Sequence, residues 1–261
     1  MSGNESSRII AIASGKGGVG KTWLAISLAQ ALAEAGQRVL LVDADFGLAN
    51  IDVQLGLPPG PDLGEVLAGR CGLGAAVRRH AAGFDLLPGR SGCGSLAGLG
   101  EAAAGRLGAM LREAAAAWDA VLLDCGAGIE PAVRGLAALA DTLLVVATGE
   151  PTSLTDAYAV LKLHRRDRPA GDQRVVVNLA EDAAAGERVW RSLETACLRF
   201  LGAGVPLAGI VRRDQRVPEA IRHQAPLLTR HPLTSAAEDV RHLAAALNAV
   251  SPKKRKLHPV I

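Results

Sequence analysis

The residues best suited to chemistry lie between positions 15 and 22, where the sequence fits the phosphate-binding pattern G-x-x-x-x-G-K-[ST]. Glycines allow the backbone to curl so that its N–H groups point at phosphate oxygens. The side chain of Lys21 can contact the β- and γ-phosphates of a nucleotide, and the Thr22 hydroxyl can ligate Mg²⁺. We predict a phosphate site at Gly15, Lys16, Gly17, Gly18, Val19, Gly20, Lys21 and Thr22, the alternative being a glycine-rich turn that binds nothing.

Carboxylates follow two apolar segments further along the chain. Asp124 ends the run 120–124, and Asp43 and Asp45 follow the run 38–43. The carboxyl ends of parallel strands face the ligand crevice in open α/β sheets. Asp124 is therefore a candidate for the outer Mg²⁺ shell, and of Asp43 and Asp45 one can support the metal while the other orients water. The alternatives are a capping aspartate and an ordinary polar loop.

The choice of base depends on residues 178–181. GTPases of this class usually recognise guanine through Asn-Lys-x-Asp, whereas this chain has Asn178-Leu179-Ala180-Glu181 and lacks the lysine and the second acid. The comparison favours ATP over GTP. Asn178 is a candidate for a hydrogen bond to adenine, and the alternative is an asparagine that only terminates its strand.

Short apolar runs alternate with Ala- and Leu-rich stretches at helical spacing, which predicts strands and helices in turn. Because the strands are apolar on both faces, we predict an α/β fold with a doubly wound, mostly parallel sheet flanked by helices. We expect a flexible N-terminus at 1–7, one nucleotide-binding domain at 8–250 and a basic tail at 251–261. The predicted strands are 8–14, 38–43, 84–87, 120–124, 142–148, 174–179 and 207–211, and the predicted helices are 22–35, 63–68, 101–117, 131–140, 152–165, 184–201, 218–224 and 235–250.

Composition excludes several other classes. The net charge of +3 is too small to imply nucleic-acid binding by itself. The four cysteines are scattered without a C-x-x-C pair, so neither a zinc site nor a disulfide framework is expected. No apolar run approaches the ~18–20 residues that a transmembrane helix needs. The polar opening residues resemble no secretory signal, and we expect a cytoplasmic protein.

With these residues in place, the sequence resembles the MinD/ParA group of ATPases with a deviant Walker A motif. The segment 16–22, Lys-Gly-Gly-Val-Gly-Lys-Thr, carries the resemblance, and Lys16 distinguishes it from an ordinary P-loop. The resemblance implies that Lys16 reaches the nucleotide of the partner subunit in an ATP-dependent homodimer. It also implies that Asp43 and Asp124 support Mg²⁺ and that Asp45 activates the attacking water. A solvated loop lysine is the alternative for Lys16.

Within that group the chain looks similar to the FlhG/FleN family of MinD-like flagellar regulators. Residues 43–57 resemble its switch I, 121–129 its Walker B and switch II, and 150–163 its most discriminating segment. Asn50 falls in switch I. The resemblance implies control of flagellar number or placement through an FlhF-type SRP GTPase, flagellar switch-complex proteins and a flagellar transcription activator. ParA-like DNA partitioning and a MinD-like role at the cell-division site are the alternative functions.

Two residues depart from the family, and two C-terminal features bear on localisation. Arg212 stands where relatives commonly have proline, on the adenine side, and Cys125 replaces a residue that is often threonine. The last predicted helix is a weak membrane binder because it lacks Phe and Trp. Basic residues at 253–256 can add attraction to anionic lipid. A solvated tail, a transient peripheral contact with the inner face of the membrane and a contact with nucleic acid all remain open.

Overall fold

The computed structural model describes residues 8–89, 100–113 and 117–249, and the predicted N-terminal segment 1–7 and basic tail 251–261 lie outside these ranges. The described residues contain an eight-stranded sheet in the order β3-β4-β2-β5-β1-β6-β7-β8. All neighbouring strands are parallel except β3 and β4. The strands are β1 (Arg8–Ser14), β2 (Val39–Ala44), β3 (Arg78–Arg79), β4 (Asp85–Leu87), β5 (Ala120–Ala127), β6 (Thr142–Ala147), β7 (Asp172–Ala180) and β8 (Leu207–Arg212).

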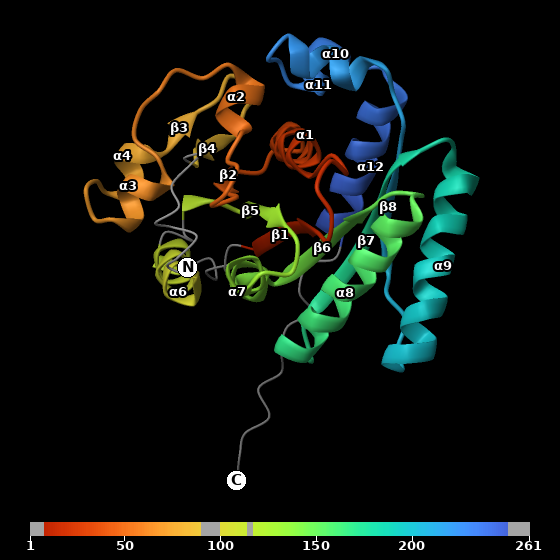
Figure 1. The fold of residues 1–261 in the computed structure, drawn as a ribbon. Coiled ribbons are helices and arrows are strands. Elements are labelled where there is room, and N and C mark those ends of the chain that lie inside the picture. The colour runs from red at the N-terminus through yellow and green to blue at the C-terminus, as the bar shows by residue number, and fades with distance from the viewer. Residues whose placement is uncertain (1–7, 90–99, 114–116, 250–261) are drawn as a thin grey trace, which may run out of the picture.

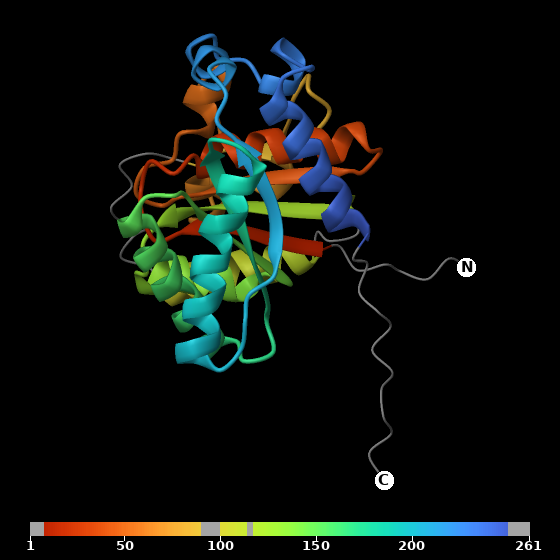
Figure 2. The same cartoon turned by 90° about the vertical axis from the view of Figure 1, so that its right-hand side faces the viewer.

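Helices cover both faces of this sheet (Figure 1). One layer contains α1 and α12, and the other contains α6, α7, α8 and α9, as the view along the sheet also shows (Figure 2). The predicted doubly wound α/β fold is therefore confirmed. The helices are α1 (Lys21–Glu34), α2 (Ile51–Leu55), α3 (Leu63–Leu67), α4 (Leu73–Ala76), α6 (Gly100–Glu113), α7 (Pro131–Leu139), α8 (Pro151–Asp167), α9 (Ala183–Leu201), α10 (Arg216–Arg222), α11 (Leu227–Arg230) and α12 (Ser235–Ala249).

The central strands consist of apolar residues that are buried on both faces. Strand β2 is buried along its whole length, and β6 likewise. A strand without a solvent face cannot alternate apolar and polar residues, so it appears in the sequence as a continuous apolar run. The glycine-rich loop follows β1 and Asp45 follows β2 at one edge of the sheet. Asp43 and Asp124 lie within β2 and β5 near that edge, and β5 continues three residues beyond its predicted end at Asp124.

The predicted helices and strands match the structure to within a few residues, while four short elements were not predicted. These are α2, α4, α11 and the two-residue strand β3. Each is five residues long or shorter. A segment of that length shows no complete hydrophobic period, so its structure depends on tertiary contacts.

The C-terminal helix α12 is part of the core. Its apolar residues, including Val240, Leu243 and Leu247, are buried among residues of α1 and β8. This face is therefore not available for a membrane surface, and the expected attraction to anionic lipid would depend on the basic residues 253–256, which lie outside the described ranges. Among the described residues, no helix has both the length and the apolar character needed to cross a membrane.

The buried centre of the sheet allows a stability prediction. Leu122 in β5 is 0% exposed, whereas Leu233 before α12 is 97% exposed. We expect Leu122→Ala to lower the free energy of unfolding by about 2–5 kcal/mol, because it removes buried methyl groups and leaves a cavity. Leu233→Ala should change it by less than about 0.5 kcal/mol. Urea denaturation of both variants measures the difference, and equal losses would contradict this description of the core.

Candidate functional site

The glycine-rich loop connects β1 to α1 and is held by contacts on two sides. Gly20 is the N-cap of α1 and has a φ of 85°, a left-handed conformation that suits glycine. A Cβ on Gly15 would lie 2.3 Å from the carbonyl oxygen of Asp156 in α8, so only glycine fits there. The Ser14 hydroxyl donates to the carbonyl of Lys16 at 2.6 Å. The loop is thus shaped by the protein, with the N-terminus of α1 facing the phosphate position.

Behind this loop, Lys21 and Thr22 lie next to Asp124. Asp124 is only 1% exposed, and burial raises the pKa of its carboxyl to about 8. The nearby carboxylate of Asp43 raises it further, while the Thr22 side chain and the Lys21 ammonium lower it. Strand register explains this crowding, because Asp43 in β2 pairs directly with Asp124 in β5.

Asp43 is equally buried, but its oxygens accept hydrogen bonds from the backbone of switch I, which we define as residues 45–57. Its Oδ2 accepts from the N–H groups of Asn50 at 2.9 Å and Ile51 at 3.0 Å. Burial raises the pKa of Asp43 to about 6, and these hydrogen bonds oppose the rise. Asp43 therefore connects the metal side of the site to the start of α2.

Asp45 lies just beyond the end of β2 and organises the next turn. Its Oδ1 accepts from the N–H groups of Gly47 at 3.0 Å and Leu48 at 2.9 Å. Gly126 of switch II, defined as residues 125–130, approaches the same carboxylate, and a Cβ there would lie 3.2 Å from Oδ1. Gly128 joins switch II to the phosphate loop, because its N–H donates to the carbonyl of Ser14 at 2.9 Å.

These residues fit a magnesium ion bound with a nucleotide. The Oδ1 atom of Asp124 is buried and has no hydrogen-bond partner within the described ranges, so it is an acceptor without a donor. Hydroxyl and carboxylate oxygens are the ligands that Mg²⁺ prefers. Thr22, Asp43 and Asp124 are the residues that would hold the ion. When bound, the ion would neutralise charge on the phosphates and on the buried carboxylates.

Lys16 lies at the outer side of the loop rather than in the phosphate cradle. Its side chain is 39% exposed and forms an ion pair with Glu150 at the start of α8. The ammonium also donates to the Thr152 hydroxyl at 3.2 Å. Lys16 and Lys21 therefore differ in environment, since the latter is buried beneath the loop.

Asn178 in β7 supports the phosphate loop through its amide nitrogen, while its amide oxygen is bound by the next residue of the strand. Its Nδ2 donates to the carbonyl of Val19 at 2.8 Å, and its Oδ1 accepts from the N–H of Leu179 at 2.9 Å. Leu179 has a φ of 57°, which turns the chain at the end of β7. The amide nitrogen carries two N–H donors, so one remains for a base. Its predicted bond to adenine stays a prediction.

Arg212, the last residue of β8, links this strand to α12 through hydrogen bonds. Its backbone N–H donates to Asp239 Oδ2 at 2.8 Å, a bond that proline cannot make. Its guanidinium binds both carboxylate oxygens of Asp239 and one of Glu238. The residue therefore points to the C-terminal helix, and its pKa is raised by these acids.

Two cavities lie at the same edge of the sheet. One, of about 390 Å³, lies between the two switch segments, with Asp45, Gly47 and Gly126 among its lining residues. The other, of about 610 Å³, lies beside the starts of α8 and α9, with Glu150, Arg188 and Arg213 in its wall. The first is bounded by residues of both switch segments, and the second by Glu150, the partner of Lys16.

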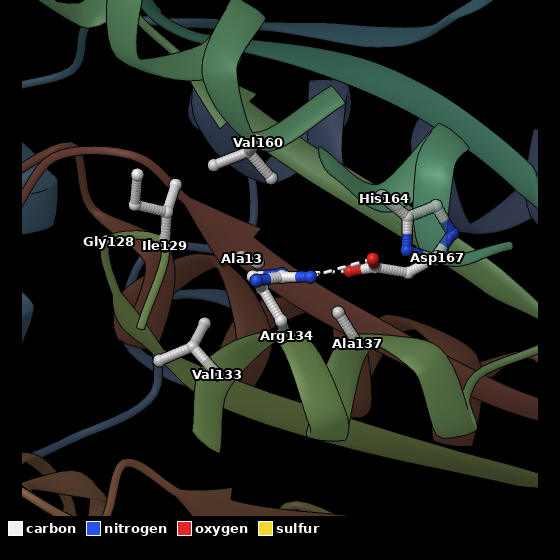
Figure 3. A pocket seen from close by; sticks show the side chains of 9 residues that line it. All are labelled: Ala13, Gly128, Ile129, Val133, Arg134, Ala137, Val160, His164 and Asp167. Carbon is white, nitrogen blue, oxygen red and sulfur yellow. Dashed lines mark hydrogen bonds and ion pairs between the residues drawn. The ribbon is translucent and has the colours of Figure 1, made fainter. Parts of the chain in front are cut away.

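A third cavity, behind switch II, is too small to bind a ligand. Figure 3 shows Arg134 of α7 pointing to Asp167 of α8 across it, with His164 beside the pair. Arg134 makes two hydrogen bonds to that carboxylate, at 2.8 and 2.7 Å. The volume of about 10 Å³ is at the lower limit for one water molecule. This contact joins the helices that follow switch II and Glu150.

The structure brings together the predicted residues of the phosphate loop and the three predicted aspartates. Sequence analysis missed Glu150 and Thr152 as partners of Lys16, although both lie in the segment 150–163 that carried the family resemblance. It also missed the role of Asp43 at the start of α2. An aspartate eight residues before the first residue of a short helix gives no capping signal in the sequence.

The fold and the site together define a P-loop nucleotide-binding protein of the α/β class. The model of the CobQ/CobB/MinD/ParA nucleotide binding domain matches residues 10–227, and the chain belongs to this family.

Cys125 lies in switch II and is buried. Burial raises the pKa of its thiol and so disfavours the reactive thiolate.

Individual relatives agree with this membership. The antiactivator FleN of Pseudomonas aeruginosa is 36% identical over 88% of this chain and 82% of its own length. The flagellum site-determining protein YlxH of Helicobacter pylori is 30% identical over 85% of this chain and 77% of its own. Among solved structures, the septum site-determining protein MinD of Pyrococcus horikoshii, complexed with Mg-ADP, has a TM-score of 0.79 and 25% identity, covering 96% of this chain and 100% of that one.

The raised pKa of Asp124 leads to a prediction about pH. In metal-free buffer the folded state binds more protons than the unfolded state between the usual carboxyl pKa and about 8, so stability should fall as pH rises through that window. We expect Asp124→Asn to reduce the change in the free energy of unfolding between pH 5 and pH 8. At pH 8 it should stabilise the metal-free protein by at most about 6 kcal/mol, because the pKa rises from 3.8 to about 8 and each pKa unit corresponds to about 1.4 kcal/mol.

Urea denaturation at pH 5 and pH 8 with a chelator measures the effect. Asp119→Asn is the matched control, because Arg38 lowers the pKa of this more exposed carboxyl and it stays ionised across the window. The control variant should show the same change of unfolding free energy with pH as the wild type. If the Asp124→Asn protein is less stable than wild type at pH 8, ionisation of the buried carboxyl does not destabilise the folded state.

Proposed function

We propose that this protein is an ATP-hydrolysing dimerisation switch that regulates flagellar number or placement in a bacterium. The observation that carries the proposal is the position of Lys16. Its ammonium lies outside its own phosphate cradle, half-exposed and paired with an exposed acid, while Lys21 supplies the internal phosphate contact. A lysine so placed is able to reach a nucleotide bound by a second copy of the chain.

The chain's own groups supply the parts that phosphoryl transfer needs. The loop and the start of α1 bind phosphate, Lys21 offsets its charge, and Thr22 with Asp43 and Asp124 holds Mg²⁺. Asp45 orients the attacking water from the junction of the two switch segments, where Gly126 meets it. We expect slow turnover that a partner stimulates, because Oδ1 of Asp45 is already occupied by the N–H groups of Gly47 and Leu48.

The flagellar role is supported by the names of two relatives, an antiactivator and a flagellum site-determining protein. On this proposal the ATP-bound dimer binds an FlhF-type SRP GTPase, flagellar switch-complex proteins or a flagellar transcription activator, and hydrolysis releases them. We propose a cytoplasmic protein that makes peripheral contact with the inner face of the membrane at most transiently.

Two alternative roles are a MinD-like ATPase at the cell-division site and a ParA-like DNA-partitioning ATPase. A DNA surface needs free basic side chains. Arg212 is bound by Asp239, and Arg216 pairs with Glu219 at 2.6 Å, so two arginines of that region have acidic partners. These ion pairs count against nucleic-acid binding. Salt-dependent affinity for DNA would favour the partitioning role.

The proposal predicts that nucleotide controls the oligomeric state. With Mg²⁺-ATP the protein should become a dimer in light scattering, and with Mg²⁺-ADP it should stay a monomer. Asp45→Ala should accumulate the ATP dimer and slow hydrolysis about 100-fold or more, as expected when a group that orients water is lost. Lys16→Ala should bind ATP but remain a monomer.

Lys162→Ala is the matched control, since it removes another exposed lysine, on the outer part of α8. It should dimerise as the wild type does. Lys16→Ala protein that still dimerises with ATP would refute the role of Lys16 between subunits, and undiminished hydrolysis in Asp45→Ala would refute the role of Asp45.

A further inference from the structure

Helix α2 lies in switch I and is too short to be stable without tertiary contacts. At its start, Asp43 accepts the N–H groups of Asn50 and Ile51. Ile51 and Leu55 are buried and fix one face of the helix in the core. The position of α2 is thus tied to Asp43, a residue of the proposed metal site.

The other end of α2 contacts Gln224, in the turn after α10. The Nε2 of Gln224 donates to the carbonyl of Val53 at 3.0 Å. Its side chain lies against Gly56, where a Cβ would come within 2.9 Å of Gln224 Oε1. The Val53 carbonyl also accepts from the N–H of Gly56, the C-cap residue, at 3.3 Å, so the Gln224 amide is a second and shorter donor to the last turn. Figure 1 shows α2 and α10 close together, and they are in contact.

The backbone at Gln224 has a φ of 51°, a left-handed conformation that is costly for a residue with a Cβ. Glycine would adopt it freely. Residues other than glycine remain in this region where surrounding contacts determine their conformation. Here the side chain of Gln224 makes such a contact, with a helix that lies 171 positions earlier in the sequence.

Helix α10 connects this contact to the end of β7, the strand that carries Asn178. Asp214 accepts the N–H of Arg216 at 2.9 Å and the hydroxyl of Ser235 at 3.2 Å, which fixes the start of α10. The N–H of Arg213 donates to the carbonyl of Ala180 at 2.7 Å, at the end of the strand that carries Asn178. A continuous set of contacts therefore leads from the ends of β7 and β8 to switch I.

We propose that Gln224 is a positioning residue that holds α2, and through it the Asp43–Asp45 segment, in the arrangement needed for hydrolysis. The inference rests on the proposed function, because it concerns ATP turnover at that site. Gln224 touches neither Asp43 nor Asp45. It acts through the Val53 carbonyl and the short helix between them.

Two variants test the role. Gln224→Glu keeps the length of the side chain but puts a carboxylate, which cannot donate, against the Val53 carbonyl. Gln224→Gly removes the side chain and relieves the backbone. In both variants, hydrogen exchange of residues 47–57 should be about five-fold faster, as expected from the loss of one hydrogen bond. Exchange of α1 should not change. The kcat for ATP should fall about five-fold while KM stays the same.

Gln37→Ala is the matched control, because the amide of Gln37 bonds to Asn248, away from switch I. It should change neither quantity. Unchanged exchange at 47–57 in both Gln224 variants would overturn the positioning role, as would an unchanged or higher kcat. Hydrogen exchange tests the contact even if the wild type hydrolyses no ATP, and that outcome would refute the proposed function separately.

Discussion

The burial of Asp43 and Asp124 next to each other is the constraint on which the rest of the site depends. Parallel pairing of β2 with β5 places these carboxyls at the same level of the sheet, where almost no water reaches them. Two like charges in a buried position are unfavourable unless cations or donors compensate for them. The phosphate loop supplies Lys21 and Thr22, switch I supplies N–H groups, and the remaining acceptor on Asp124 matches a metal ion.

Much of this arrangement could be predicted because it is encoded locally. The strand before the glycine-rich loop appears as a continuous apolar segment, the helix after it as an Ala- and Leu-rich stretch at helical spacing, and the loop has its own spacing pattern. The aspartates could be placed at one edge because parallel strands end there. What local patterns omit is the role of Asp43 as acceptor for α2, since that helix forms only where the folded protein provides both the acceptor and the buried surface for Ile51.

Side chains that act over long sequence separations could not be predicted in the same way. Asn178 was predicted to contact a base, and in the structure its amide fixes the phosphate loop 159 positions away. Arg212 was predicted to affect the adenine side, and in the structure it binds Asp239 of α12. The contact of Asn178 with a base stays a prediction, and the partners that both residues have in the fold lie too far along the chain for a local pattern to indicate them.

The contacts of Lys16 and Asp43 differ in how easily they can be broken. Lys16 is paired with Glu150 at an exposed position, where water screens the attraction. Such a pair orders the lysine without binding it strongly, and phosphate groups in a dimer would offer a greater charge. Asp43, in contrast, is buried and bound by two N–H groups of α2, so it moves only with that helix. The exposed lysine can therefore exchange partners freely, whereas the metal-side carboxylate requires concerted movement of switch I.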